Sequence, residues 1–582
     1  MSFYYKFEED RFLLGGDHPY VSYVAQSLAE DFGQIVELDA LTVGTTYFFK
    51  PYQNEALKAS EAFKRGVAKG ISAELLSANK SFIKLQKTLV LTSEENFVWQ
   101  SMQEIIPSLE ELWASTASPM HEVYYFNVDK DQLKDKLPLF LGVDNIFVTC
   151  FNLKIARTVE LLRERIGIDA RFFIELHNMA TIACWPFHEW GMGKGFKTND
   201  VFISTCQYDL EALKIVYPEA QQALIPFHAV KLPEVETRSV FKAKNIFAYV
   251  GRISAQKNLH TLLAALSLIK EIDFECHFYG GEDHLGSPNM GQTGEGYLNY
   301  LKGLVKELEL EAKVFFKGHY PREKLYEELH HNQVILVSPS LHSDENFGMA
   351  LFRGLLLGQR VVCSDWGGHK DFVGHFPEQV KLVSVYKTNK GPQVHPFELA
   401  KALVEMLEIK PSKNHLPTAY QLGSLRLKIQ ELLGFSKLEN KKLERSSIAE
   451  QIHQKRNDYL SSTQNSHLEH QRSHGCQIFS SYEDKLAHIF FEAYGMRKSQ
   501  KKGGLSVLLP WVYKKGENLV SYDLHRAKID YGKNHKNENN VFDWAGNKIE
   551  IDAEIFKKMW NNGDLISVDH GYLCPLNEVK QV

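Results

Sequence analysis

The sequence contains little cysteine, no long apolar run and no excess of charge of one sign. Only 7 of its 582 residues are cysteine and none forms a CxxC pair, which argues against a disulfide framework and favours a reducing, cytoplasmic location. No apolar run approaches the roughly 20 residues that a membrane-spanning helix needs. Lys and Arg number 67 against 72 Asp and Glu, a net charge of -5, so general nucleic-acid binding is not expected.

The N-terminus also lacks the basic and then apolar pattern of a signal peptide, because MSFYYKFEEDRFLLGG is acidic. The overall composition, with 44% hydrophobic and 24% charged residues, is that of a globular protein. This excludes a mainly disordered, collagen-like or coiled-coil chain. At roughly 150 residues per domain, the length allows about four domains, or two or three larger α/β units.

Apolar strands and helical patterns alternate between residues 245 and 375. Strands are predicted at 245–250, 274–281, 313–318, 333–340 and 360–365. Apolar residues at helical spacing separate them and predict helices at 257–270, 294–310, 321–332 and 347–358. Such alternation predicts a parallel, doubly wound sheet, and the near-continuous apolar strands indicate a sheet buried on both faces.

The first 230 residues carry a second, looser copy of this α/β pattern. A strand near 3–7 leads to Gly15-Gly16 and then to a predicted helix at 18–33. Residues 50–140 look helical and are expected to form an insertion that shapes a substrate cleft. Further strands are predicted at 145–150, 171–176, 199–205 and 222–228, and a helix is predicted at 156–167.

Four regions follow from these patterns. A charged passage, 231–244, joins the two α/β halves, and one more helix is predicted at 420–435. Residues 437–475 are polar and poor in large apolar side chains, as in a linker or solvated helices. We therefore expect a Rossmann-like domain at 1–232, a second at 233–436, a polar linker at 437–475 and a small α+β accessory module at 476–582.

Two cations follow the predicted strand at 245–250. Open α/β sheets bind ligands at the carboxyl ends of their strands. Arg252 offers a planar fork of donors, and Lys257 places a point charge at the start of a helix, whose free N–H groups also attract anions. The pair is typical of a diphosphate site, although an exposed surface pair has the same pattern.

Polar residues also follow other strands. Glu345, after the strand at 333–340, can accept hydrogen bonds from sugar hydroxyls, or it can be an acid that stabilises the first turn of a helix. Gly348 lets the backbone approach a ligand. His177, after the strand at 171–176, has a structural and a catalytic interpretation. Gly15-Gly16, before a helix, suits a phosphate or a sugar.

Taken together, these motifs resemble the retaining, nucleotide-sugar-dependent glycosyltransferases of family four, the glycosyl transferases group 1. Their GT-B fold has two facing Rossmann domains. The resemblance is strong in the second half, where it rests on YVGRISAQKN, FYGG, VFFKG, VILVSPS and ENFGMALFRGLLLGQRVVCSDWGG. It is weaker in the first half, where it rests on Gly15-Gly16, IELHN and FISTCQYDLEALKIVYPEAQQALIPFHAV.

The resemblance implies catalytic roles for four residues. Arg252 and Lys257 would bind the donor diphosphate and stabilise it as it leaves, which is the largest expected catalytic effect. Glu345 would contact the hydroxyls of the donor sugar, and His177 would lie near the reacting sugar. No metal and no cofactor are implied, because basic residues and helix dipoles replace the metal and the nucleotide sugar is a substrate.

The resemblance also implies a set of donor-binding residues. Phe347 and Gly348 would present backbone N–H groups to the sugar or phosphate, and the glycine pair would let the diphosphate approach the first domain. The complete donor-binding set is Gly15, Gly16, Asn346, Phe347, Gly348 and Arg353.

The sequence departs from the family pattern at Arg353, where the family carries a second Glu that accepts hydrogen bonds from the ribose. Arginine has no acceptor. Either the nucleotide is held differently or the site is degraded. The Glu usual after Gly367-Gly368 is also replaced, with Asp371 as a shifted substitute.

We expect a cytoplasmic hexosyltransferase that moves a sugar from a nucleotide-diphosphate sugar to an unidentified glycan, lipid-linked sugar or small-molecule acceptor, with retention of anomeric configuration. The alternatives are an epimerase or hydrolase of the same fold, and an inactive GT-B protein that acts as a binding partner. A PLP-dependent phosphorylase is a third alternative, although no lysine lies in a cofactor-like setting. Two further signals have ordinary explanations. The residues HLEHQRSHGC (467–476) fit a solvated linker better than a zinc site, and the basic cluster at 497–502 fits a charged loop better than a weak membrane-surface contact.

Overall fold

The structure is a computed structural model. It describes residues 3–8, 11–16, 46–49, 86–94, 101–133, 140, 142–179, 182, 187, 195–228, 245–282, 296–332, 334–341, 345–388, 391–412, 416–434, 440–462, 485–497, 505–521, 529–533, 539–544, 547–562 and 564–568.

The first domain is built on a six-stranded parallel sheet with the order β5-β4-β6-β7-β8-β9. Apolar side chains cover both faces of its central strands, which explains their near-continuous apolar sequences. The strands are β4 (Gln86–Thr92), β5 (His121–Asn127), β6 (Asn145–Val148), β7 (Arg171–Leu176), β8 (Val201–Ser204) and β9 (Gln221–Leu224). The helices are α3 (Met102–Ala114), α5 (Leu153–Glu160), which continues into a π-helical turn (Leu161–Arg165), and α8 (Gln207–Val216).

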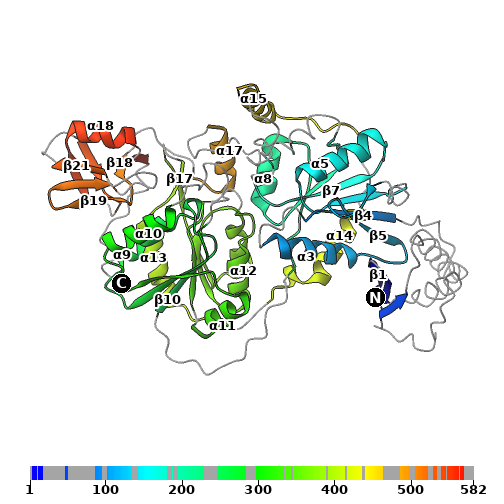
Figure 1. The fold of residues 1–582 in the computed structure, drawn as a ribbon, viewed down its shortest axis with the longest axis horizontal. Coiled ribbons are helices and arrows are strands. Elements are labelled where there is room, and N and C mark those ends of the chain that lie inside the picture. Colours follow the sequence, from blue (N-terminus) through cyan, green and yellow to red (C-terminus); the bar gives the residue numbers. More distant parts are fainter. Residues whose placement is uncertain are drawn as a thin grey trace, which may run out of the picture.

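The second domain repeats this architecture with the strand order β12-β11-β10-β13-β14-β15, again all parallel. Its strands are β10 (Asn245–Val250), β11 (Phe274–Tyr279), β12 (Val314–Gly318), β13 (Ile335–Ser338), β14 (Arg360–Ser364) and β15 (Val380–Val383). Its helices are α9 (Leu259–Leu268), α10 (Tyr297–Glu307), α11 (Arg322–Asn332), α12 (Met349–Leu356) and α13 (Pro396–Leu407). The two Rossmann-like domains lie side by side (Figure 1), so the predicted GT-B fold class is confirmed.

The glycine pair of the first domain is not where the sequence analysis placed it. The predicted strand near 3–7 exists as β1 (Phe3–Glu8), but it belongs to a separate antiparallel sheet with β2 (Arg11–Gly16) and β3 (Thr46–Phe49). Gly15 and Gly16 end β2 and pair with β1, so the prediction of a turn between a strand and a helix of the parallel sheet is wrong. The predicted helix at 18–33 lies outside the described residues.

The prediction of a helical insertion at 50–140 is also wrong for the part that the structure describes. Residues 86–127 form β4, α3 and β5, and β4 is the first strand of the parallel sheet. Thr92 and Ser93 therefore lie at the carboxyl end of β4, the position that the sequence pattern predicts for the glycine pair. A short apolar run does not distinguish a buried strand from a buried helix, which explains the error. Residues 50–85 lie outside the described part of the chain.

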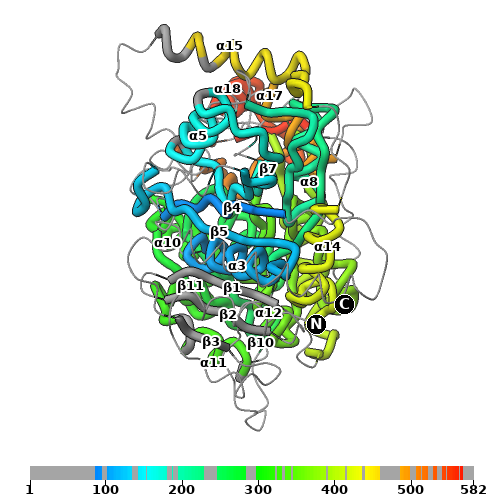
Figure 2. Tube along the Cα trace, turned by 90° about the vertical axis from the view of Figure 1, so that its right-hand side faces the viewer, coloured from blue at the N-terminus to red at the C-terminus, as the bar shows by residue number. Residues whose placement is uncertain are grey.

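After the second sheet, the chain returns to the first domain. Helix α14 (Leu422–Gly434) lies against α3, and α15 (Ser447–Ser462) lies against α8 (Figures 1 and 2). Leu443, Ala449 and Ile452 are buried, so this part of the predicted linker contacts the first domain, while most of its other described side chains are exposed or half-buried.

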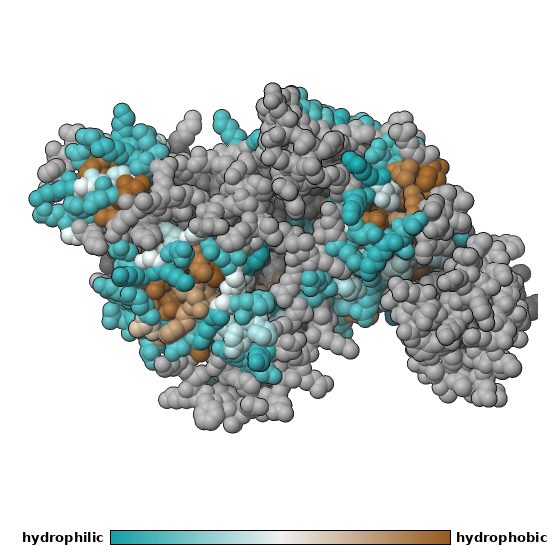
Figure 3. Space-filling view, viewed as in Figure 1, coloured by the Kyte–Doolittle hydropathy of each residue, from teal (hydrophilic) through white to brown (hydrophobic). Residues whose placement is uncertain are grey.

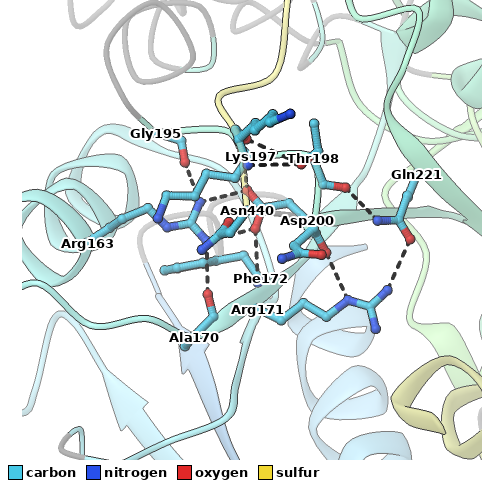
Figure 4. A network of polar contacts seen from close by, with 12 residues as sticks. Arg163, Ala170, Arg171, Phe172, Gly195, Lys197, Thr198, Asp200, Gln221 and Asn440 are labelled. Carbon is cyan, nitrogen blue, oxygen red and sulfur yellow. Dashed lines mark hydrogen bonds and ion pairs between the residues drawn. The ribbon is translucent and has the colours of Figure 1, made fainter. Parts of the chain in front are cut away.

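A buried polar network fastens this return segment (Figure 4). Arg163 donates two hydrogen bonds of 2.7 Å to the carboxylate of Asp200, and both side chains are almost fully buried. Beside them, the Thr198 N–H donates to the Lys441 carbonyl at 2.8 Å. Arg171 reaches the carbonyl of Leu432 in α14 at 3.3 Å. The network lies at the amino-terminal ends of β7 and β8.

The C-terminal module docks on the second domain. Its Trp511 indole lies 5.2 Å from the His260 ring at the start of α9. The module contains two sheets and helix α18 (Ala553–Asn562). The mixed sheet is formed by β18 (Leu505–Leu508), β22 (Asn539–Phe542), β23 (Lys548–Ile551) and β24 (Leu565–Val568). The antiparallel sheet is formed by β19 (Val512–Lys515), β20 (Asn518–Ser521) and β21 (Ile529–Lys533).

Apolar surface is scattered among the described residues. On the face drawn in Figure 3, the described surface is mainly hydrophilic, with small separate apolar patches. The exposed large apolar side chains come from several different elements: Leu161, Leu224, Phe315, Ile409, Leu416, Leu427 and Trp560. Among the described helices, none is both long and apolar enough to cross a membrane.

Candidate active site

A cleft of about 390 Å³ lies between the two domains and is lined from both sides. The first domain contributes the start of α3 and the residues after β7. The second contributes the residues after β10 and β13, one side of α11, and the first turns of α12. Eight residues predicted for the site line this one cleft: His177, Arg252, Lys257, Glu345, Asn346, Phe347, Gly348 and Arg353.

The loop after β10 presents the two predicted cations. The Tyr249 hydroxyl donates to the Arg252 carbonyl at 2.6 Å and fixes the loop backbone. The glycine after β11 supports the loop from behind, since a Cβ on Gly280 would lie 1.8 Å from the Gly251 carbonyl oxygen. Lys257 ends a 3-10 helix, Ala255–Lys257, directly before α9. Local backbone geometry thus places both cations at the carboxyl end of the sheet.

Lys257 and Glu345 form an ion pair inside the cleft. Their Nζ and Oε2 atoms are 2.5 Å apart, and their side chains are 15% and 10% exposed. Burial acts to raise the pKa of the Glu345 carboxyl, but Lys257 and His369 more than offset this and hold the pKa well below its usual value. Glu345 is therefore a carboxylate across the neutral range and an acceptor for hydroxyl groups.

Sequence reasoning missed the role of His369, which supports Glu345. Its Nε2 lies 3.6 Å from Glu345 Oε1, and its ring is fully buried. The ring also underlies Gly348, where a Cβ would come within 3.0 Å of His369 Cδ2. Gly348 has a φ of 75°. A glycine is therefore required at this position, because of the backbone conformation and because a Cβ has no room beside His369. The Gly367-Gly368 pair after β14 is the sequence signal for this close packing.

The first turn of α12 lines the cleft beside these residues. Gly348, Met349, Ala350 and Leu351 all border it, and the first N–H groups of a helix have no partner within the helix. With Arg252 and Lys257 nearby, this wall of the cleft favours an anion.

Arg353, where the sequence departs from the family pattern, is paired across the cleft. Its guanidinium contacts the carboxylate of Glu104 in the first turn of α3, and the two side chains are 17% and 9% exposed. Its Cζ also lies 5.9 Å from the Tyr326 ring. Burial lowers the pKa of Arg353 to about 10, so the guanidinium remains charged at neutral pH. The sequence analysis missed Glu104 because it lies in the stretch interpreted as an insertion, although Ser101-x-x-Glu104 before an apolar run is typical of a helix start.

His177 faces the cleft as a neutral imidazole. Burial lowers its pKa to about 4, although a hydrogen bond to Thr149 acts in the opposite direction. The bond from Nε2 to the Thr149 carbonyl is 2.6 Å long, so Nε2 carries the proton. Within the part of the chain that the structure describes, Nδ1 has no hydrogen-bond partner. Nδ1 is therefore left as an acceptor, and the atom itself is buried.

Two predicted donor-binding residues also hold the domains together. The Asn346 amide donates to the Thr205 hydroxyl of the first domain at 3.3 Å. The Phe347 ring lies 5.2 Å from Phe227, also in the first domain. Asp371 is at this junction as well, where its carboxylate accepts from the Gln207 N–H at 3.4 Å. Burial raises the pKa of Asp371 to about 6.

The discounted sequence signals fall mostly outside the described residues. This applies to residues 467–476 with their histidines, and to Lys498, Lys501 and Lys502. Arg497 is described, and its N–H donates to the Val385 carbonyl at 2.9 Å. Among the residues that the structure describes, there is no group of three or more His, Cys, Asp and Glu side chains that could hold a metal ion.

The comparisons with known proteins point to the same domain. Residues 233–386 match the profile of the family described as glycosyl transferases group 1. Over this segment, the second domain is similar to that family. The resemblance noted in the sequence is thus confirmed for the second domain, and the matched segment contains Arg252, Lys257, Glu345 and Arg353.

Individual relatives cover less of the chain. Mannosylfructose-phosphate synthase of Agrobacterium fabrum is 29% identical over 134 residues, which are 23% of this chain and 28% of that protein. The chain therefore spans less than a third of the length of this curated relative.

Two solved structures illustrate the likeness in fold. A glycosyltransferase from Rickettsia africae aligns with 60% of this chain and 100% of its own, with a TM-score of 0.40 and 15% identity. The catalytic domain of starch synthase IV from Arabidopsis thaliana, bound to ADP and acarbose, aligns with 57% of this chain and 75% of its own, with a TM-score of 0.34 and 11% identity. Both TM-scores are below 0.5, so we base the function on the cleft and on the family match.

Proposed function

We propose that this protein is a glycosyltransferase that moves a hexosyl group from a nucleotide-diphosphate sugar to an acceptor hydroxyl, with retention of anomeric configuration and without a metal ion. One observation carries the proposal. Two cations that follow β10, together with a carboxylate and a helix N-terminus that follow β13, line a single cleft between the domains. Cations with helix N–H groups suit a diphosphate, and a carboxylate suits sugar hydroxyls.

The diphosphate would bind at Arg252, Lys257 and the start of α12. These groups would stabilise the negative charge that develops as the bond between the anomeric carbon and the diphosphate oxygen breaks. The acceptor oxygen would form the new bond to the anomeric carbon, and its proton would pass to the departing diphosphate. This exchange is balanced without any added reactant or metal.

Glu345 and Lys257 would change partners when the donor binds. In the structure they neutralise each other at 2.5 Å. A diphosphate would compete with the carboxylate for the Lys257 ammonium, and Glu345 would then accept hydrogen bonds from the sugar. His177, which lines the same cleft, would lie near this sugar. Closure of the cleft would exclude water from the reaction.

A donor screen tests this proposal. The full chain is mixed with UDP-, GDP-, ADP- and CDP-linked sugars, and its thermal midpoint and the slow hydrolysis of the donor are followed, the latter by mass spectrometry. We expect one donor class to stabilise the protein and to be hydrolysed, with both signals lost in Arg252→Ala and Glu345→Ala. Glu309→Ala, which removes an exposed ion pair with Lys270, is the matched control and should keep both signals.

Two results of this screen would contradict the proposal. If no nucleotide sugar binds, the protein is not a transferase and the interpretation as a binding partner takes its place. A donor that is epimerised or hydrolysed without an acceptor is also tested with glycan, lipid-linked and small-molecule acceptors. If none of these acceptors changes the rate at which the donor is consumed, the enzyme is an epimerase or a hydrolase of the same fold. The cytoplasmic location is part of the proposal and would be checked by fractionation of cells.

A further inference from the structure

Helix α17 (Lys485–Tyr494) lies far beyond the matched family segment, yet it sits at the junction of the two domains. It packs against α8 of the first domain. It also contacts the second domain, where Phe491 and Tyr494 pack against the ring of Trp366 with centroid distances of 5.6 and 5.5 Å. Tyr494 is fully buried there.

The Tyr494 hydroxyl holds two parts of the first domain. It donates to the buried carboxylate of Asp209 on α8. It also accepts from the Met179 backbone N–H at 3.4 Å. Met179 stands two residues after His177, in the loop that lines the cleft. The hydroxyl therefore ties this loop to α8.

The Tyr494 ring holds the other wall of the cleft. A Cβ on Gly367 would lie 2.6 Å from Tyr494 Cε1 and 2.4 Å from the Glu345 carbonyl oxygen, so only a glycine backbone fits between the ring and the Glu345 loop. The Gly368 N–H donates to this same Glu345 carbonyl at 2.9 Å. One residue thus stands between Tyr494 and the carboxylate-bearing loop.

The helix itself is fixed to the second domain at both sides of Tyr494. Glu492 pairs with Lys387 at 2.8 Å. Gly495 has a φ of 135°, and a Cβ on it would lie 2.3 Å from the Asp365 carbonyl oxygen, so the chain turns tightly against the end of β14. The hydrogen bonds of Tyr494 with Met179 and Asp209 therefore connect a helix that is fixed to the second domain with residues of the first domain.

We infer that Tyr494 is a positioning residue, which sets the His177 loop and the Glu345 loop relative to each other through Met179 and Gly367. The chain outside the family match thus completes the support of the cleft. The kinetic consequence of this inference rests on the proposed function, but the structural consequence does not.

Hydrogen–deuterium exchange tests the structural consequence on the full chain. Tyr494→Phe removes the hydroxyl and keeps the ring. Because a net hydrogen bond is worth about a five-fold change in an opening equilibrium, we expect the Met179 amide and the peptide at 177–179 to exchange about five-fold faster. Tyr531→Phe is the matched control, because its hydroxyl also donates to an aspartate, Asp564, in the C-terminal module, and it should leave this peptide unchanged.

Kinetics test the functional consequence with the donor found in the screen. We expect Tyr494→Phe to lower the turnover number about ten-fold with little change in the affinity for the nucleoside diphosphate. In a His177→Ala background, Tyr494→Phe should have no further effect on turnover, while its effect on the thermal midpoint should persist. If Tyr494 had only a structural role, Tyr494→Phe would lower the thermal midpoint, but its effect on turnover would not depend on His177.

The outcomes separate the two proposals. Unchanged exchange at 177–179 in Tyr494→Phe would overturn the inference about Tyr494, whatever the activity. An inactive wild-type protein with faster exchange in the variant would overturn the proposed function and support the positioning role. If Tyr494→Phe does not fold, Asp209→Asn weakens the same contact and should accelerate the exchange of Met179 about two-fold.

Discussion

At the scale of single residues, the most distinctive feature of the cleft is the pair of Arg353 and Glu104. Removing two charges from water costs free energy that a buried ion pair recovers only in part, and removing one partner leaves the other charge uncompensated. The pair also connects the two walls of the cleft. Arg353 is therefore better explained as part of a domain contact than as the mark of a degraded site.

This pair gives a prediction about coupled substitutions. We expect Arg353→Gln and Glu104→Gln each to destabilise the protein by about 3 kcal/mol, because each strands a buried charge. The double variant should be less destabilised than the sum of the two single variants. Thermal midpoints and calorimetric titration with the nucleoside diphosphate measure stability and binding. Strict additivity would show that the two residues do not act as a pair, and Lys270→Ala, in an exposed ion pair, serves as a control that should cost less than about 1 kcal/mol.

A second residue-scale prediction concerns the acid sensitivity that His177 confers. Its pKa is about 4 in the folded protein, below the ordinary value near 6.5, so the unfolded chain binds the proton more readily. The contribution of neutral His177 is complete above about pH 6.5 and is lost as the pH falls toward about 4. Between pH 7 and pH 5, this loss amounts to about 2 kcal/mol.

The measurement compares His177→Gln with the wild type at these two pH values. Acidification should lower the thermal midpoint of the variant less than that of the wild type. The exposed residue His319 provides the control, and His319→Gln should follow the wild type. A variant as acid-sensitive as the wild type would show that His177 is not held neutral by burial.

At the scale of elements, the return segment and the network in Figure 4 fasten the end of the GT-B core to the first domain. We expect Asp200→Asn to destabilise the first domain by about 3 to 5 kcal/mol, since it breaks a buried bidentate pair with Arg163. The network lies at the amino-terminal ends of β7 and β8, whereas the cleft lies at the carboxyl end of β7. Donor affinity of the folded variant should therefore be unchanged.

Thermal unfolding and limited proteolysis near residue 440 check this expectation. The exposed pair of Lys130 and Glu94 offers the contrast, and Lys130→Ala should cost less than about 1 kcal/mol. A loss of donor affinity in Asp200→Asn at a temperature where it is folded would show that the network also shapes the cleft.

At the scale of the whole molecule, the two domains meet through contacts that are far apart in the sequence. Arg353 and Glu104 are separated by 249 positions, and Tyr494 and Asp209 by 285. The cleft is formed by these contacts and by the crossing of α14 to the first domain. Neither sheet alone presents the complete set of side chains.

The sequence by itself determined the second domain and its cations. Buried parallel strands are continuously apolar, and their glycines and polar residues mark the strand ends, so β10 to β14 and the positions of Arg252, Lys257 and Glu345 could be predicted. The same reasoning failed for β4 and β5, because a short apolar run is shared by buried strands and buried helices. It also failed for Gly15 and Gly16, because local pattern does not show which sheet a strand joins.

Only the tertiary structure decided which residues face each other across the cleft. Glu104, His369 and Tyr494 act by spatial contact with the predicted residues, and no local spacing connects them to those residues. Periodicity reports the burial of a residue within its own element, whereas a pairing between elements depends on how the domains pack. For this reason the chemistry of the strand ends was readable from the sequence, and the support that positions it was not.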